Sequence, residues 1–268
     1  MLKDITLGQY FPGNTVAHRL DPRTKILLVT LYIVALFCAK QVVSYGLMAL
    51  TLLACVKISK VRFKTMVRGL KPVVFIVVFT AVLNLFFTPG ERELVKIGFL
   101  RISDTGLENA IFMVLRILLL IMGTFLMTYT TSPISLTDGL ERLLNGLKRF
   151  RVPVHELAMM MSIALRFIPT LIEETDKIMS AQKARGADFE SGNLIDKAKA
   201  LIPVLVPLFI SAFRRADELA TAMECRCDHG GEGRTKLHVL KYESRDYIAL
   251  ALGALVLALI LVLRRFGI

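Results

Sequence analysis

Five stretches of the chain are long, apolar and almost free of charge, and they limit the folds that the chain can adopt. Four of them contain no Asp, Glu, Lys, Arg or His, and the fifth contains one charged residue, Arg116. The stretches are Ile26–Ala39, Val42–Val56, Pro72–Phe87, Asn109–Thr128 and Tyr247–Leu263. Runs of this length are typical of membrane helices. We therefore predict an all-α integral membrane protein with about five transmembrane helices.

The composition supports a membrane protein and argues against secretion. The chain of 268 residues is 54% hydrophobic, with a mean hydropathy of +0.59, which is too apolar for a soluble domain of this length. No small-residue cleavage site follows the first run, so we expect a retained helix rather than a signal peptide. The cysteines Cys38, Cys55, Cys225 and Cys227 form no disulfide framework, and we expect reduced thiols.

The net charge of +12 is explained by membrane topology rather than by nucleic acid. Six basic residues and no acidic residue crowd the loop between the second and third runs, namely Lys57, Lys60, Arg62, Lys64, Arg68 and Lys71. The positive-inside rule places this loop in the cytoplasm. The loop 88–108, which has mixed charge, is then outside.

Counting membrane crossings from this basic loop predicts the side of the remaining parts of the chain. The tight junction Lys40-Gln41 makes the first two runs a hairpin, although a bend within Ile26–Val56 instead of two crossings stays open. The amino terminus and the segment 132–246 then lie in the cytoplasm. We expect three parts: membrane helices in 1–131, a coupling-helix domain in 132–246, and a membrane helix in 247–268.

The cytoplasmic segment contains a short amphipathic helix followed by two long helices that share an unusual composition. Each long helix has an apolar half, Leu157–Ile172 or Ala200–Phe213, and then a charged half. The apolar halves are too short to cross a hydrocarbon core of about 30 Å, and a helix that is apolar all round must be buried. We expect them at the inner face of the membrane, against the bundle or a partner.

Methionines are concentrated on the first of these apolar halves. Met159, Met160 and Met161 are either gap fillers or part of a surface that accepts several partners, and both interpretations stay open. We expect a membrane partner to contact four residues here, namely Met160, Met161, Leu165 and Ile168.

The two long helices end on matching arginines. Aligning Arg185 on Arg226 also aligns Asp176 on Asp217 and Ala181 on Ala222, all at an offset of 41 residues. Small residues flank both arginines, which gives the guanidinium access to a narrow groove, and a guanidinium pairs with carboxylates in two-pronged fashion. Gly186 suits a left-handed helix cap after Arg185. A single such arginine is most simply a helix cap. Two in register predict a pair of docking tips, Ala184–Gly186 and Cys225–Cys227, with two sockets on similar partners.

Motifs for catalysis or nucleotide binding are missing. The sequence has no phosphate loop, no Gly-x-Gly-x-x-Gly and no nucleophile turn, and the membrane runs lack midplane acids, histidines or lysines. We therefore expect no enzyme, no cofactor and no metal, although Cys225, Cys227 and His229 leave a metal site as an alternative. Arg116 should be paired inside the bundle with a partner that the sequence does not name. A coupling subunit driven by separate ATPases fits best; a self-contained ABC permease half and a membrane-embedded enzyme are the alternatives.

The sequence resembles the transmembrane T component (EcfT family) of energy-coupling factor transporters, which take up vitamins in bacteria. The resemblance covers nearly the whole chain and is carried by "HRLDPRTK" (His18–Lys25), "LRFIPTLIEE" (Leu165–Glu174), "AQKARG" (Ala181–Gly186) and the second tip around Arg226. It implies a subunit of the bacterial cell membrane whose coupling helices dock, by the two tip arginines, on two ATPases. It also implies an exchangeable substrate-binding membrane protein on the apolar coupling-helix surface, so substrate choice lies on another chain.

The second tip departs from the family pattern. Where the family commonly has Ala-Arg-Gly, this chain has Cys225-Arg226-Cys227. The arginine and the small flanks are kept, so we expect docking to survive. Because the glycine cap is lost, we expect the helix to end about a turn later, at Gly230-Gly231.

Overall fold

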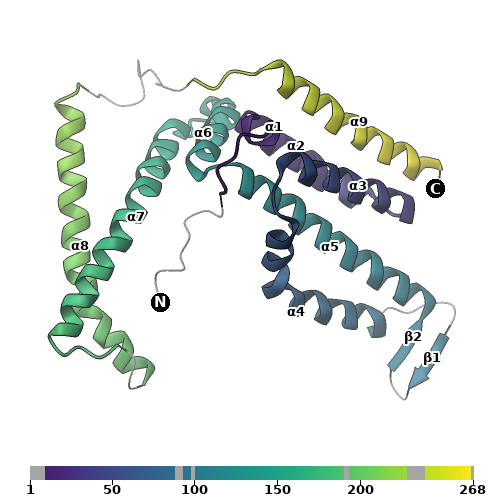
Figure 1. Cartoon of the computed structure of the whole chain (residues 1–268), viewed down its shortest axis with the longest axis horizontal. Helices are drawn as coiled ribbons and strands as arrows, with labels where there is room; N and C mark the ends of the chain where they lie inside the picture. The colour runs from purple at the N-terminus through teal and green to yellow at the C-terminus, as the bar shows by residue number, and fades with distance from the viewer. Residues whose placement is uncertain (1–9, 88–92, 98–99, 190–192, 228–238, 267–268) are drawn as a thin grey trace. The chain divides into compact units, whose positions relative to one another are not determined.

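The computed structural model of the chain describes residues 10–87, 93–97, 100–189, 193–227 and 239–266. In this part the fold is helical apart from one two-stranded hairpin (Figure 1). The chain divides into two compact units. The bundle unit comprises Gly8–Leu140 and Leu240–Ile268, and the α7–α8 unit comprises Glu141–Val239.

The bundle unit is built from helices of very different lengths and one hairpin, which lies at the ends of α4 and α5. Its elements are α1 (Val16–Arg19), α2 (Pro22–Cys38), α3 (Val42–Ser59), α4 (Phe63–Phe87), β1 (Glu93–Ile97), β2 (Leu100–Ser103), α5 (Asp104–Thr130), α6 (Pro133–Leu144) and α9 (Ser244–Phe266). The last turn of α6 already belongs to the α7–α8 unit, which continues with the 3₁₀ helix η2 (Asn145–Phe150), α7 (Val154–Ala184) and α8 (Leu194–Glu224).

Local sequence explains where the first membrane helices begin and end. Asp21 caps α2 by accepting the backbone N–H of Arg23, and Pro22 occupies the first turn, where its missing N–H costs nothing. Helix α3 ends at Ser59, and the next residue, Lys60, adopts a left-handed conformation with φ of 55°. Helices α2 and α3 are two separate helices joined at residues 39–41. That they form a hairpin across the membrane stays a prediction.

Helix α5 is central to the packing of the bundle unit, because it packs against α2, α3 and α4, while α9 packs on α2. Glycines allow two of these approaches: a Cβ on Gly123 would lie 2.6 Å from the ring of Tyr32, and a Cβ on Gly253 would lie 2.6 Å from Leu28. The largest fully buried apolar side chains of this core are Tyr129, Leu36, Met48, Met66 and Ile260.

The predicted number of membrane helices agrees with the structure, but one member differs. Five helices of the described part are long and apolar enough to cross a membrane, namely α3, α4, α5, α7 and α9. Helix α2, which we expected to be one of the five, has 17 residues and a length of about 25 Å. Helix α7 joins the set although only its first half was predicted to be apolar. Its location at the inner face of the membrane stays a prediction.

The loop 88–108 contains structure that the charge pattern did not predict. Strands β1 and β2 pair in antiparallel fashion, with Lys96 opposite Arg101 and Ile97 opposite Leu100. Helix α5 then begins at Asp104. In the sequence, apolar and basic residues alternate at Val95, Lys96 and Ile97, which is the pattern of a short strand.

Candidate functional site

The first predicted tip has a complete helix-ending motif. Helix α7 ends at Ala184, and Gly186 adopts a left-handed conformation with φ of 90°. The N–H of Gly186 donates to the carbonyl of Lys183 and the N–H of Ala187 to that of Gln182. This pair of bonds is a Schellman motif, so the predicted cap at Gly186 is confirmed. It fixes the backbone of Arg185 at the very end of the helix.

The second tip also has a left-handed residue after its arginine, but its helix ends two residues before the arginine instead of one. Helix α8 ends at Glu224, and Cys227 has a positive φ of 57°, directly after Arg226, as Gly186 directly follows Arg185. The expectation that the helix runs on for another turn was wrong, because the chain turns at Cys227 itself. Gly230 and Gly231 lie outside the described residues.

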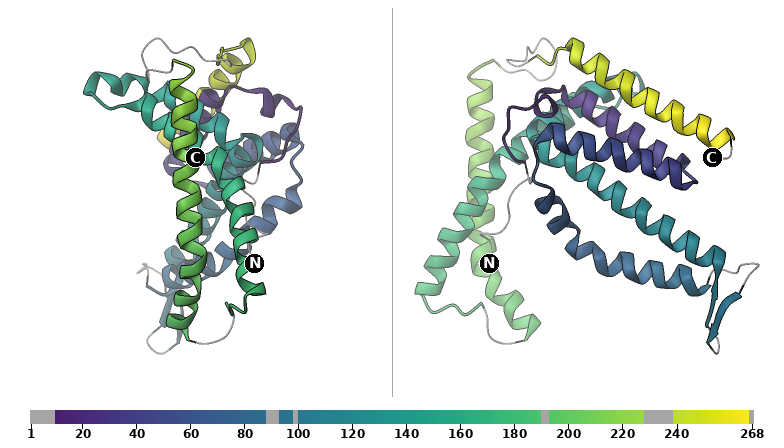
Figure 2. Two further views of the ribbon diagram at one scale, coloured as in Figure 1. Left: turned by 90° about the vertical axis from the view of Figure 1, so that its left-hand side faces the viewer. Right: turned by 45° about the vertical axis from the view of Figure 1, so that its right-hand side comes forward.

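Helices α7 and α8 form an antiparallel pair (Figure 1, with a second view in Figure 2). Gln182 on α7 donates to the carbonyl of Pro203 on α8 at 3.3 Å, and Arg215 on α8 pairs with Glu174 on α7 at 2.8 Å. Because the helices run in opposite directions, the end of α7 and the end of α8 lie at opposite ends of the pair.

Both tip arginines are free to contact another molecule. Arg185 and Arg226 are exposed, as are Ala184, Cys225 and Cys227 beside them. Within residues 10–87, 93–97, 100–189, 193–227 and 239–266, no ion pair involves either guanidinium. An exposed arginine on a rigidly capped helix end can insert into an acidic groove without reorganising its own backbone.

The four residues predicted to contact a membrane partner differ in exposure. Met160 and Met161 are exposed, with 55% and 47% of their surfaces accessible. Leu165 and Ile168 are half-buried within the α7–α8 unit. The two methionines are therefore the accessible part of the predicted interface.

Sequence reasoning assigned no contact residues to the larger apolar surface, which is on α8. Within the run 200–213, seven large apolar side chains are exposed, namely Leu201, Ile202, Leu205, Val206, Phe209, Ile210 and Phe213. This run was expected to lie against the bundle or a partner, but only residues of α7 were named as an interface. Its aromatic content was the available signal, because exposed phenylalanines are costly in water.

Arg116 has partners that the sequence did not name. Its Nε donates to the hydroxyl of Tyr45 at 2.9 Å, and its Nη2 lies 3.4 Å from the carbonyl of Ala39. The ring of Tyr45 stacks on Phe112, with centroids 5.1 Å apart. Asn84 donates to the carbonyl of Thr80 at 3.0 Å. Arg116 and Asn84 are thus both engaged by their neighbours.

The alternative of a metal site near the second tip gains no support from the described residues. Cys225 and Cys227 are exposed free thiols. In the described parts of the chain no group of three or more His, Cys, Asp or Glu side chains could hold a metal ion. His229, the third member of the predicted cluster, lies outside those parts.

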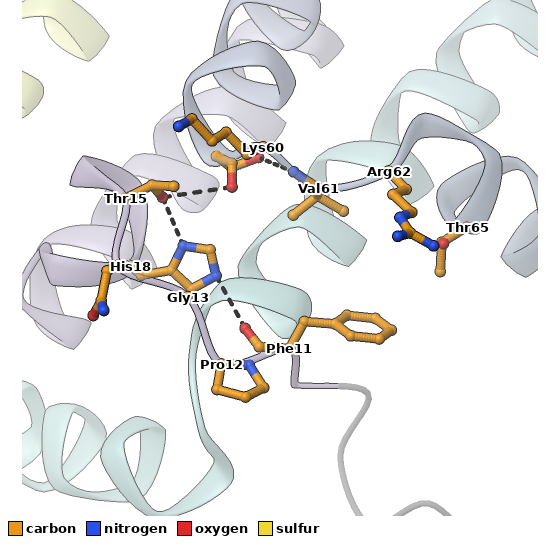
Figure 3. A pocket seen from close by; sticks show the side chains of 11 residues that line it. Phe11, Pro12, Gly13, Thr15, His18, Lys60, Val61, Arg62 and Thr65 are labelled. Atoms are coloured by element: carbon orange, nitrogen blue, oxygen red, sulfur yellow. Dashed lines mark hydrogen bonds between the residues drawn. The ribbon is translucent and has the colours of Figure 1, made fainter.

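A groove of about 590 Å³ lies beside the turn between α3 and α4 (Figure 3). His18 holds the leader, the segment 10–20 before α2, along this groove. Its Nδ1 lies 2.6 Å from the Thr15 hydroxyl, and its Nε2 lies 3.0 Å from the carbonyl oxygen of Phe11. Burial, with a smaller contribution from the charge of Lys25, lowers the pKa of His18 against the opposing effect of the Phe11 bond. Lys60 and Arg62 line the far side.

Comparison with known proteins places the chain in a family. Residues 13–237 match the profile of the CbiQ family, described as cobalt transport protein. The chain is 57% identical to a protein of Clostridium kluyveri over 266 residues, which cover 99% of this chain and 98% of the relative. It is 48% identical to a protein of Bacillus subtilis strain 168 over 264 residues, covering 98% and 100%. Both relatives are named energy-coupling factor transporter transmembrane protein EcfT.

The chain belongs to the CbiQ/EcfT family.

A third member of the CbiQ/EcfT family, from Acidaminococcus fermentans, is 51% identical over 268 residues, covering 100% of this chain and 99% of the relative. The resemblance drawn from the sequence motifs is therefore confirmed. Together with the apolar helices, CbiQ/EcfT membership makes the chain a multi-pass membrane protein with a role in transport.

Proposed function

We propose that the chain is the transmembrane coupling subunit of an energy-coupling factor importer. In this role it transmits ATP-driven motion from two ATPase subunits to an exchangeable, substrate-binding membrane subunit. The names of its relatives support the transport system. Neither a self-contained permease half nor a membrane-embedded enzyme fits this family.

The observation that carries the proposal is the arrangement of the two tips. Arg185 and Arg226 end antiparallel helices, each arginine is exposed, and each is followed by a left-handed residue. Two similar tips that face opposite ways suit two similar sockets on a pair of ATPases. Each guanidinium would enter an acidic groove as a charge-assisted contact.

The substrate-binding subunit is assigned to the apolar surface of the same helices. Met160 and Met161 on α7, with Phe209 and Phe213 on α8, expose apolar area that a membrane partner would cover. Half-buried Leu165 and Ile168 would support this surface from beneath. Methionines adapt to differently shaped partners, which suits a subunit that is exchanged.

The proposal divides the work between subunits. The sequence has no phosphate-binding loop, so ATP hydrolysis is assigned to the partners, and substrate choice to the membrane partner. The substrates would be vitamins. The basic loop from Lys57 to Lys71 supports a location of the coupling helices on the cytoplasmic side of the bacterial cell membrane.

A copurification tests the proposal. The tagged chain is expressed in its native host, extracted in mild detergent and analysed for bound proteins and for ATP hydrolysis. We expect two ATPase subunits and one small membrane protein, with hydrolysis that disappears when the ATPases are stripped away. A homodimer without a separate membrane partner would indicate a permease half. An isolated chain with catalytic activity would indicate an enzyme.

A further inference from the structure

The start of helix α2 is the place where the chain on both sides of the α7–α8 unit is anchored. Helix α6 leads into that unit, and residues 240–246 follow it. In the bundle unit both segments contact residues between Asp21 and Lys25. None of these contacts is needed to explain the tips or the apolar surface.

After the α7–α8 unit, the chain is anchored by a buried carboxylate. Asp246, in the first turn of α9, has 1% of its surface exposed. Its Oδ1 accepts the backbone N–H of Asp21 at 2.9 Å, and its Oδ2 accepts the backbone N–H of Glu243 at 2.9 Å. One side chain thus fixes the first turn of α9 to the residue that caps α2.

Arg23 extends this anchor to the segment before α9. Its Nε and Nη2 donate to the two carboxylate oxygens of Asp21 at 3.0 and 2.8 Å. The same guanidinium lies 3.9 Å from the ring centre of Tyr242. An arginine that is held flat by a two-pronged carboxylate contact and stacked on an aromatic ring has little freedom to move.

Before the α7–α8 unit, the chain is anchored by a close backbone contact. Gly139 on α6 packs against Pro22 so tightly that a Cβ at this glycine would lie 2.8 Å from the Pro22 Cβ and 3.2 Å from its carbonyl carbon. Because α6 is one continuous helix to Leu144, a displacement of its far end acts directly on this contact.

Lys25 connects the same place to the centre of the bundle unit. Its buried Nζ donates to the carbonyl of Thr130, the last residue of α5, at 2.8 Å, and to the carbonyl of His18 at 3.1 Å. The core helix α5, the leader, α6 and α9 therefore all meet at the first turn of α2.

We infer that this anchor, formed by Asp21, Arg23, Gly139, Tyr242 and Asp246, is where motion of the coupling helices enters the membrane bundle. The inference rests on the proposed function. Because α6 runs on from this anchor to Leu144 and residues 239–246 return to it, a displacement of the chain at either of these two junctions acts on the start of α2. These residues are positioning residues for transport and contact neither ATP nor substrate.

The test separates coupling from assembly. The full complex, with its ATPases and membrane partner, is reconstituted in liposomes with Asp246→Asn, Tyr242→Leu or Gly139→Ala. Asp246→Asn keeps the shape but leaves one of the two N–H donors facing an amide NH₂. Arg245→Gln is the matched control, because Arg245 is the neighbouring residue and its side chain pairs with the exposed Glu243.

We expect all three variants to retain their subunits and ATP hydrolysis but to lose roughly fivefold or more of the uptake per ATP hydrolysed. The control should match the wild type. Unchanged uptake per ATP in intact variant complexes would overturn the inference, as would loss of the subunits in all three variants. Failure of the wild-type complex to bind ATPases would instead contradict the proposed function.

Discussion

Glu174 on α7 and Arg215 on α8 form an ion pair at 2.8 Å, and they occupy equivalent positions in the two similar halves of the coupling segment. They are separated by 41 residues, the same offset that relates Arg185 to Arg226. Each tip arginine follows its member of the pair by 11 residues, or about 16 Å along the helix. The tips are therefore placed symmetrically about this pair, roughly 30 Å apart along antiparallel helices.

The symmetric pairing predicts that the two charges can be exchanged. Glu174→Arg alone and Arg215→Glu alone should each lower the thermal stability of the purified chain, because like charges then face each other. The combined exchange should restore it. Since the pair is half-exposed, the effect should be up to about 1 kcal/mol. A double variant that is less stable than either single variant in scanning fluorimetry would contradict this pairing.

The two helix ends should respond in opposite directions to changes at their left-handed residues. Cys227→Gly should stabilise the end of α8 by up to about 1 kcal/mol, because a residue with a Cβ is disfavoured at a φ of 57°. Gly186→Ala should destabilise the end of α7 by a similar amount or more. Hydrogen exchange of the last-turn amides measures both effects. The same sign in both variants would show that these ends do not share one geometry.

Met161→Asp should release the substrate-binding subunit and leave the ATPases bound. Met161 is exposed, so the change should affect the fold little, whereas Leu165→Asp should also lower stability because Leu165 is half-buried. Lys177→Asp, an exposed change on the charged half of α7, is the control and should leave all subunits in place. Copurification measures the outcome. Loss of the ATPases with the membrane partner retained would reverse the assignment of the two halves.

The leader should detach as the pH falls. The pKa of His18 is lower in the fold than its unfolded value of about 6.5, because burial disfavours the charged ring. The stabilisation is therefore fully present above pH ~6.5 and is lost as the pH falls through the lowered pKa. The protection factor of the Phe11 amide, which bonds to the Tyr129 carbonyl, should drop between pH 7.5 and about 5. In His18→Gln this dependence should disappear; if it persists, another group is responsible.

Local signals in the sequence were sufficient for much of the fold and for part of the site. The glycine after Arg185 predicted a left-handed cap because glycine alone adopts that conformation at no steric cost. In the second tip the left-handed residue is Cys227, which has a Cβ. The search for a glycine therefore predicted the helix end at Gly230-Gly231 instead. The hairpin at Val95 and Ile102 was not predicted, because the segment was interpreted from its mixed charge and its alternating pattern is short.

Contacts between distant residues had no signal in a single sequence. Asp21 and Asp246 are 225 positions apart, and both are acidic, so charge complementarity predicts repulsion rather than contact. They meet because Asp246 accepts a backbone N–H rather than a side chain. Arg116 was expected to be paired, but its partner is the hydroxyl of Tyr45 rather than a carboxylate, and a tyrosine in an apolar run does not reveal that role.

The most direct test of the account compares uptake by complexes that differ only at the tips. Arg185→Glu, Arg226→Glu and the double variant are reconstituted with their partners, and Arg214→Glu, an exposed arginine of α8 outside the tips, is the control. ATP-dependent uptake and bound ATPase are measured on the same liposomes. Loss of one desolvated charge contact costs about 2–5 kcal/mol, so each single variant should weaken coupling and the double variant should abolish uptake or release the ATPases. The control should behave as wild type. A double variant with full ATPase content and full uptake would show that the two arginines are ordinary helix caps.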